Sequence, residues 1–286
     1  MNFAKAALPV GTLLRDWRLR RHLSQLDLAG AAAVSTRHLS FVESGRSAPS
    51  RAMVMRLANR LDVPLRERNR LLVAAGYAPM YGERSLDDPE MGVVRKAVEA
   101  VLKGHEPYPA LAVDRHWTLV SYNRAVPILI SGADAELLRP PVNVLRLSLH
   151  PGGLAPRIVN LGEWRAHLLE RLRRQISASA DPVLAELAAE LRSYPGSGED
   201  ECAAEQEVVV PLLLAVPEGR ISLISTTTVF GTPTDVTLSE LALETFFPAD
   251  TASAEYLRRA MDVVPAADPM RDGAPDGDPS LGVAPG

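Results

Sequence analysis

Residues 24–46 carry polar and charged side chains at a spacing that suits contact with duplex DNA. Ser24 and Ser35 are each placed to begin a short helix, and Leu39 and Val42 lie three residues apart on one face of the second helix. Two helices joined by a tight turn place one across the DNA backbone and the other in the major groove. The spacing therefore predicts a helix-turn-helix with its polar side chains facing outward.

Charge is divided unevenly along the chain. Residues 1–84 hold 14 Lys and Arg against 6 Asp and Glu, a net charge of +8, whereas the remaining residues hold 17 against 29, a net charge of −12. A basic segment joined to an acidic one is typical of a polyanion-binding module attached to a second module. Charge alone would also suit RNA or a membrane surface, so the helix-turn-helix pattern is what favours DNA.

The sequence gives little support for an enzyme active site, a metal site or a membrane-spanning segment. The sequence contains none of the patterns of phosphate-binding loops, zinc proteases, nucleophile-elbow hydrolases or dinucleotide-binding folds. Its single cysteine, Cys202, allows neither an intrachain disulfide nor a cysteine-pair metal site. No apolar run reaches the roughly 18 residues of a membrane span, and no signal-peptide pattern begins the chain. We therefore expect no catalytic residue, metal, cofactor or membrane partner, and a cytoplasmic location.

The elements that must position the DNA-facing residues form an all-α domain of five short helices over residues 1–76. The first helix carries Trp17 on its apolar face, and the second begins with a near capping box of Ser24 and Asp27. Gly45 ends the third helix, the fourth begins near Ser50, and the fifth runs from about residue 65 to residue 76. A linker over residues 77–89 follows.

The second domain, residues 90–260, is expected to be α+β, with a small antiparallel sheet and helices packed on it, a type of fold that can enclose a ligand cavity. We expect helices over 90–103, 163–177, 182–193 and 252–260, a strand pair over 111–113 and 117–122, and a hairpin over 208–216 and 220–230. Asn123 is expected to cap a short helix, and Thr237 with Glu240 to begin a helix that ends at residues 247–248. Residues 261–286 are expected to be a disordered tail.

A Ser-Gln opening at residue 24, a Leu-Ala pair at 28, a Val at 34 and a Glu-x-Gly-Arg ending at 43 also occur together. With these motifs, residues 10–76 resemble the phage-repressor (XRE, Cro-type) family of helix-turn-helix domains. The resemblance implies that Gln25 supports backbone contact, that α-helical residues after Ser35 face the bases, and that Arg46 contacts phosphate. The predicted DNA-binding residues are therefore Gln25, Ser35, Thr36, Arg37, His38, Ser40, Phe41 and Arg46.

The same resemblance implies a buried ion pair between Arg18 and Glu43, which would fix the orientation of the recognition helix. Ala33 stands where the family usually has glycine in the turn. Because a left-handed alanine costs about 1–2 kcal/mol, we expect the turn to differ slightly from that of the family. Two alternatives stay open for the DNA-facing residues, since Arg37 could be a solvated charge and Phe41 could be core. Because one such domain makes few contacts, we expect a homodimer on a double-stranded DNA operator.

Motifs at residues 111–117, 143–147, 150–160, 163–165, 231–233 and 246–250 occur in the order found in another family. They resemble the PAS-like ligand-binding domain of the MmyB-like transcription regulators, which follows the same kind of repressor domain. The resemblance implies a small apolar effector, and a fatty acid is the best candidate. The alternative is a domain that only dimerises.

A fatty-acid site needs an apolar tunnel and one or two donors for a carboxylate. His150, Arg157, Asn160 and Trp164 are the predicted ligand-binding residues, because they lie close in sequence and combine donors with apolar surface. Each has a structural alternative. Arg157 and Asn160 could cap the helix near residue 163, Trp164 could be core, and His150 could stabilise a turn.

Overall fold

The computed structural model describes residues 8–195 and 209–263, which form two compact units built from discontinuous segments. The first unit comprises residues 8–96, 166–193 and 229–242, and the second comprises the remaining described residues. The expected boundaries at residues 76 and 90 stay predictions. Cys202, the start of the expected hairpin at Val208, and residues 264–286 of the expected tail lie outside the described residues.

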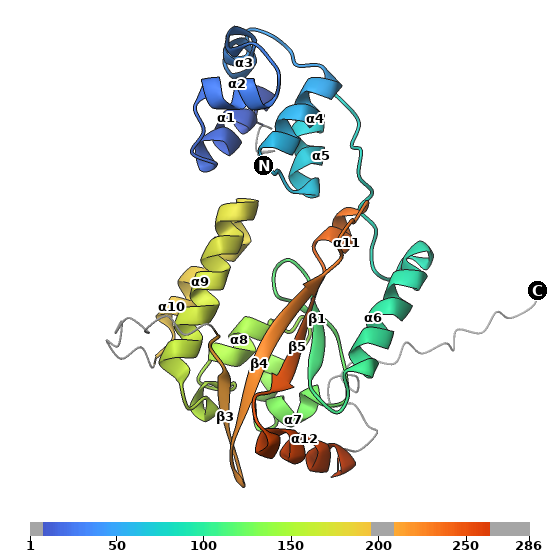
Figure 1. The fold of residues 1–286 in the computed structure, drawn as a ribbon, viewed down its shortest axis with the longest axis vertical. Coiled ribbons are helices and arrows are strands. Elements are labelled where there is room, and N and C mark those ends of the chain that lie inside the picture. Colours follow the sequence, from blue (N-terminus) through green and yellow to red (C-terminus); the bar gives the residue numbers. More distant parts are fainter. Residues whose placement is uncertain (1–7, 196–208, 264–286) are drawn as a thin grey trace, which may run out of the picture. The chain divides into compact units, whose positions relative to one another are not determined.

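Five helices open the first unit, as the sequence predicts (Figure 1). Ser24 and Asp27 form a complete capping box, since each side chain accepts a hydrogen bond from the other's backbone N–H. Ser35 and Ser50 cap the next two helices in the expected way. The helices are α1 (Val10–Arg20), α2 (Gln25–Ala31), α3 (Thr36–Glu43), α4 (Arg51–Arg60) and α5 (Leu65–Ala74).

Each of the five helices is followed, two residues after its end, by a residue with positive φ, and two of these residues are glycines. At the end of α2, Ala33 has φ of 51°, with Ala33 N–H donating to Gly30 and Val34 N–H donating to the carbonyl of Ala29. This is the Schellman arrangement, which satisfies the last carbonyl groups of a helix. Ala33 therefore adopts the left-handed conformation in the turn before the recognition helix, although it carries a Cβ atom.

Replacing Ala33 with glycine is expected to stabilise the protein by about 0.5–1 kcal/mol, because relief of left-handed strain outweighs the extra entropy of glycine in the unfolded chain. The matched control is Ala31→Gly. Ala31 is exposed and helical, so that change is expected to destabilise by about 0.5–1 kcal/mol. Urea denaturation of the full chain measures both, and the same sign for the two variants would contradict the assignment of strain to Ala33.

Glycine at position 11 sets how closely α1 approaches α3. A Cβ added at Gly11 would overlap the carbonyl oxygen of Val42 and lie 2.8 Å from that of Glu43. The backbone of α1 therefore packs directly on the last turn of the recognition helix. Leucines from all five helices fill the core beneath this contact, with Leu14, Leu39, Leu57 and Leu72 fully buried.

A five-stranded sheet with the order β2-β1-β5-β4-β3 forms the centre of the second unit, which confirms the α+β prediction. β1 pairs antiparallel with β2, and β3 pairs antiparallel with β4 in a hairpin whose last pair is Val216 with Gly219. Gly219 has φ of 135°, which a residue with a side chain rarely adopts. The strands are β1 (Ala110–Val113), β2 (Leu119–Tyr122), β3 (Leu212–Val216), β4 (Gly219–Val229) and β5 (Ala242–Pro248).

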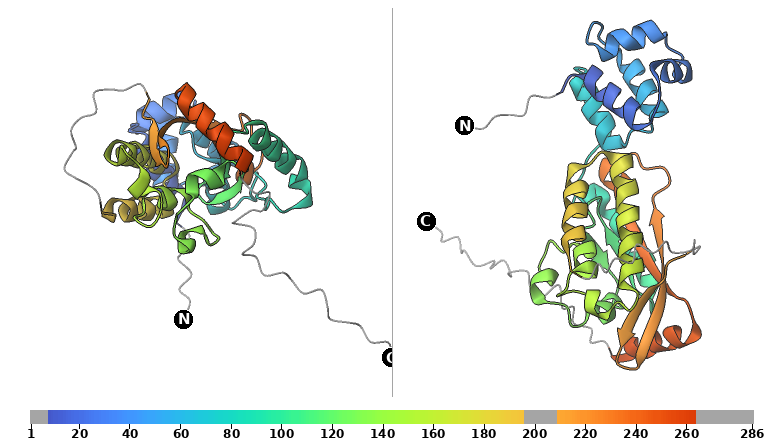
Figure 2. Two further views of the ribbon diagram at one scale, coloured as in Figure 1. Left: turned by 90° about the horizontal axis from the view of Figure 1, so that it is seen from below. Right: turned by 90° about the vertical axis from the view of Figure 1, so that its left-hand side faces the viewer.

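The helices after residue 90 follow the prediction in most places. They are α6 (Gly92–Gly104), α7 (Val126–Ile130), α8 (Val144–Leu149), α9 (Leu161–Ser179), α10 (Pro182–Ser193), α11 (Val236–Ser239) and α12 (Thr251–Val263), with short 3-10 turns at Pro89–Met91, Ala135–Leu138 and Ala155–Arg157. α12 lies against the β3–β4 hairpin (Figure 1, Figure 2), where the Ser253 hydroxyl accepts a hydrogen bond from Ser222 N–H. Its last turn extends past residue 260, where the sequence predicted the tail to begin.

The predicted helix from Thr237 to residues 247–248 is wrong. Asp235 rather than Thr237 caps α11, which ends at Ser239, and the chain then enters β5. Leu, Ala and Glu give this segment helical character, but the strand lies between β1 and β4, where Thr245 Oγ1 is 2.7 Å from Thr226 Oγ1. Sheet pairing therefore overrides local helix propensity.

The predicted cap at Asn123 is also wrong, because the N-terminal cap of α7 is Ala125. The Asn123 side chain is buried and accepts a hydrogen bond from Ala110 N–H while donating to the carbonyls of Leu102 and Tyr108. Asn123 therefore ties the chain before β1 to the segment after β2.

Candidate nucleic-acid interface and ligand pocket

The recognition helix α3 has one buried and one outward face. Leu39, Val42 and Glu43 are buried, while Arg37 and His38 are exposed. The remaining predicted base-facing residues, Thr36, Ser40 and Phe41, are half-buried, and the capping residue Ser35 is exposed. Arg37 and Phe41 therefore lie on the side of the helix opposite to its core contacts, and Thr36 and Ser40 lie nearer to the core.

Arg37 and Phe41 lie one helical turn apart and contact each other on this outward face. The guanidinium carbon of Arg37 is 5.3 Å from the centroid of the Phe41 ring. Such a cation–π contact restricts the long arginine side chain before any DNA is bound. Phe41 also accepts the backbone hydrogen bonds of Arg46 and Ser47 at its carbonyl oxygen, so the start of the following loop, with exposed Arg46, is fixed to α3.

Arg18 of α1 and Glu43 of α3 form a buried pair with two parallel hydrogen bonds. Arg18 Nε lies 2.7 Å from Glu43 Oε1 and Arg18 Nη2 lies 2.9 Å from Oε2. Arg18 Nη1 also donates to the carbonyl of Leu23, and Gln25 Nε2 donates to Glu43 Oε2 at 2.8 Å. The cluster fixes α1, α2 and α3 to one another, and Gln25 is part of it.

Electrostatics within this cluster keep Glu43 ionised. Burial by itself raises the pKa of Glu43, but the hydrogen bonds from Arg18 and Gln25 and the charge of Arg18 lower the pKa by more. The pKa of Arg18 is raised, chiefly by its hydrogen bond to Glu43. Both partners therefore stay charged at neutral pH.

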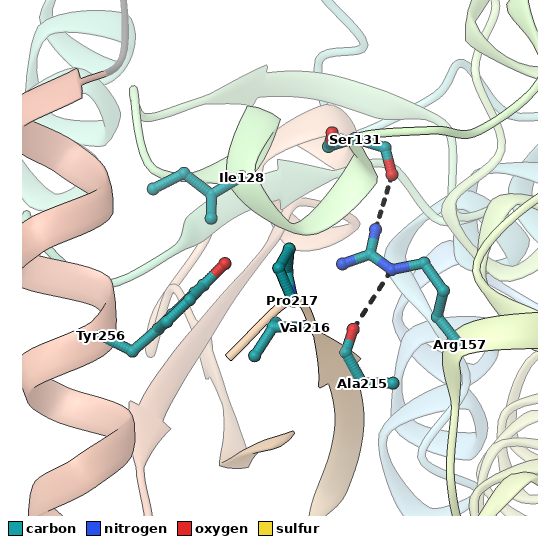
Figure 3. Close-up of a pocket in the computed structure, with 7 residues that line it drawn as sticks. All are labelled: Ile128, Ser131, Arg157, Ala215, Val216, Pro217 and Tyr256. Atoms are coloured by element: carbon teal, nitrogen blue, oxygen red, sulfur yellow. Dashed lines mark hydrogen bonds between the residues drawn. The ribbon is translucent and has the colours of Figure 1, made fainter. Parts of the chain in front are cut away.

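One predicted ligand-binding residue, Arg157, lies in a pocket of about 490 Å³ in the second unit (Figure 3). The lining residues come from α7 and the segment after it, the β3–β4 hairpin, the 3-10 turn at 155–157, and α12; they are Ile128, Ser131, Arg157, Ala215, Val216, Pro217 and Tyr256. Arg157 and Tyr256 point into the pocket from opposite sides (Figure 3). Sequence reasoning missed Tyr256, which is distant in sequence from the other predicted residues.

The Arg157 side chain is held by backbone carbonyl groups. Nη1 donates to the carbonyls of Leu129 and Ser131 at 3.0 and 2.6 Å, and Nε donates to that of Ala215 at 3.4 Å. Backbone carbonyls are uncharged, so these three acceptors do not neutralise the guanidinium at the pocket. Burial raises the pKa of Tyr256, the charge of Glu218 adds to this, and Arg157 opposes it. Tyr256 therefore stays a neutral hydroxyl donor.

The other three predicted ligand-binding residues do not line this pocket. The His150 ring accepts a hydrogen bond from Gly152 N–H and packs edge-on against Tyr194. Asn160 donates to the carbonyl of Pro211 and accepts from Leu213 N–H, and buried Trp164 donates to the Ser148 hydroxyl. These contacts match the structural alternatives for His150 and Trp164, while Asn160 anchors the start of β3.

Comparison with known protein families agrees with this two-part arrangement. Residues 94–260, more than half of the chain, match the model described as the MmyB-like transcription regulator ligand binding domain. The chain belongs to the MmyB-like transcription regulator family. Residues 14–68 of this MmyB-like regulator match a helix-turn-helix model, and a comparison with curated proteins found no significant match.

The two family matches define the general role of this MmyB-like regulator. It is a DNA-binding transcription regulator that carries a ligand-binding domain, and neither matched family is a family of enzymes. Within residues 8–195 and 209–263, no helix has the length and apolar character to cross a membrane, and no three potential metal ligands lie together.

Proposed function

We propose that this MmyB-like regulator binds its operator as a homodimer, with the outward face of α3 in the major groove, and that a small apolar carboxylic acid regulates this binding. The observation that carries the DNA-binding part is the contact between exposed Arg37 and half-buried Phe41 on the outward face of a helix fixed by the Arg18–Glu43 pair. The net charge of +8 over residues 1–84 supports attraction to phosphate. Exposed Arg46, directly after α3, is placed to contact the backbone.

The pocket in the ligand-binding domain supports the effector part. Arg157 Nε and Nη1 already donate to backbone carbonyls, so Arg157 would bind a carboxylate through Nη2 and through its positive charge. Tyr256 supplies a neutral hydroxyl opposite it. Ile128, Val216 and Pro217 supply apolar wall for a hydrocarbon chain. We propose a fatty acid with its carboxylate at Arg157 as the effector.

Replacing Arg157 with glutamine is expected to raise the dissociation constant of dodecanoate by roughly 10- to 150-fold, since a hydrogen bond to a charged group contributes about 1.5–3 kcal/mol. Isothermal titration calorimetry with the full chain measures the change. The matched control is Arg139→Gln, because Arg139 is exposed and pairs with Glu136 outside the pocket. Dodecanol, which lacks the carboxylate, should bind both variants alike, and an equal loss of dodecanol binding would contradict a headgroup role for Arg157.

Native mass spectrometry of the purified chain tests the remaining parts together, because it reports both oligomeric state and any retained ligand. Gel shifts on a duplex selected in vitro by the wild-type chain then test whether dodecanoate changes DNA affinity. A monomer without adduct, with gel shifts unaffected by dodecanoate, would exclude both the homodimer and the effector. A ligand-free dimer with the same gel shifts would favour a domain that only dimerises.

A further inference from the structure

The segment between β4 and β5 belongs to the first unit, together with the helix-turn-helix helices. Residues 229–242 include α11, whose Val236 is fully buried. β4 runs directly into this segment and β5 runs directly out of it (Figure 1). Two adjacent strands of the ligand-binding sheet are therefore joined by a segment that packs with the DNA-binding helices.

Arg66 of α5 holds this segment by a two-pronged ion pair. Arg66 Nε lies 2.8 Å from Glu240 Oε1 and Nη2 lies 2.8 Å from Oε2, while Nη1 donates to Glu83. The side chains of Arg66 and Glu240 are 24% and 19% exposed, so the pair is partly shielded from solvent. Parallel hydrogen bonds of this kind fix direction as well as distance.

A second set of contacts joins the same segment to the chain after α5. Arg84 Nη1 lies 3.1 Å from Asp235 Oδ2, and Val236 N–H donates to the carbonyl of Gly82 at 2.7 Å. A Cβ at Gly82 would lie 2.5 Å from Arg84 Nη1 and 3.0 Å from Asp235 Oδ2, so a side chain at this position would displace the Arg84–Asp235 pair. Asp235 also caps α11 through Thr237 N–H.

We propose that Arg66 is a positioning residue that couples the ligand-binding domain to the DNA-binding helices through residues 229–242. The inference rests on the proposed effector. Ala215, Val216 and Pro217 line the pocket at the hairpin from which β4 begins, and β4 continues for about 33 Å to this segment. An effector that moves the hairpin therefore moves a strand whose far end is tied to α5.

The expected consequence is that Arg66 transmits the effect of the ligand without contacting ligand or DNA. A second ligand changes affinity only through a difference between two states, with typical coupling of about 5- to 150-fold. When the ion pair is removed, Arg84 and Gly82 still contact the segment, but α11 loses its ion pair with α5. The effect of the effector on DNA affinity is then expected to weaken.

The test uses the full chain with Arg66→Gln, Glu240→Gln and the double variant. The matched control is Arg70→Gln on the same helix. Arg70 is exposed, and its ion pair is with Glu67 of α5 rather than with the segment 229–242. Hydrogen exchange of residues 229–242 is expected to rise at least about tenfold in either single variant and in the double variant alike, because both changes break one interaction. The Arg70→Gln variant is expected to match the wild type.

The second readout is the ratio of affinities for the selected duplex with and without dodecanoate. This ratio is expected to fall towards one in Arg66→Gln, while dodecanoate binding stays unchanged, a pattern that lost stability alone would not produce. Unchanged hydrogen exchange in Arg66→Gln would show that the Arg66–Glu240 pair does not hold residues 229–242. Increased exchange with a wild-type ratio of DNA affinities would show that the pair does not couple the effector to DNA binding. A wild-type chain that binds the duplex but ignores dodecanoate would instead refute the proposed effector, and with it the coupling.

Discussion

Replacing Glu43 with alanine is expected to lower the free energy of unfolding by about 3–5 kcal/mol, because the change leaves the buried Arg18 guanidinium without its carboxylate. The side chains of Arg18 and Glu43 are 9% and 3% exposed, so water cannot replace the lost hydrogen bonds. Gln25 also loses its acceptor. Urea denaturation followed by circular dichroism measures the loss.

Two comparisons separate the buried charge from a general effect of removing a carboxylate. Glu170→Ala removes an exposed carboxylate from a pair with Arg173 and is expected to cost less than about 1 kcal/mol. The double variant Arg18→Met with Glu43→Met is expected to recover most of the stability, since a well-packed apolar pair leaves no charge unpaired. If Glu43→Ala cost no more than Glu170→Ala, the pair would not fix the helices.

The same carboxylate gives the stability a pH dependence of defined sign. The pKa of Glu43 is lowered in the folded state, so its contribution is fully present above the unfolded value of about 4.3 and is lost as the pH falls through the lower folded value. Glu43→Gln removes this part of the acid sensitivity. Its stability should therefore fall less steeply than that of the wild type below that pH.

Replacing Arg37 with alanine is expected to weaken binding to the selected duplex by roughly 5- to 150-fold, since a good bidentate base contact contributes about 1–3 kcal/mol. The fold should remain intact, because Arg37 is exposed and its side chain lies over the ring of Phe41 at the surface of α3. Fluorescence anisotropy on labelled duplex, with circular dichroism of the variant, measures both.

Arg70→Ala is the matched control, since it removes one positive charge from the same domain at a site paired with Glu67. It is expected to weaken binding slightly and equally on selected and scrambled duplexes, as loss of long-range attraction does. Arg37→Lys distinguishes base reading from phosphate contact, because lysine keeps the charge but lacks the two-pronged geometry. Unchanged affinity of Arg37→Ala for the selected duplex would show that Arg37 is only a solvated charge.

Some predictions failed where a residue's partners are distant in sequence. Thr237 and Glu240 have the spacing of a capping box, but Glu240 instead pairs with Arg66, 174 positions away. Arg157 was predicted together with Asn160 and Trp164 from proximity in sequence, whereas its pocket partners come from residues near 128, 216 and 256. Nothing local marks Tyr256 or Arg66 for these roles.

The sequence by itself determined the helix-turn-helix, because its signals are local: Ser24, Ser35 and Ser50 bond to backbone groups three residues away, and periodic leucines define the buried faces. It identified the turn at Ala33, but the structure was needed to show that this alanine adopts the left-handed conformation. Only the tertiary structure decided that residues 242–248 form a strand, and that Gly11 lets the backbone of α1 pack directly on α3. It also decided that Arg66 forms an ion pair with the segment 229–242. These depend on pairing and packing between distant segments, whose free energies exceed the local preferences from which a sequence is interpreted.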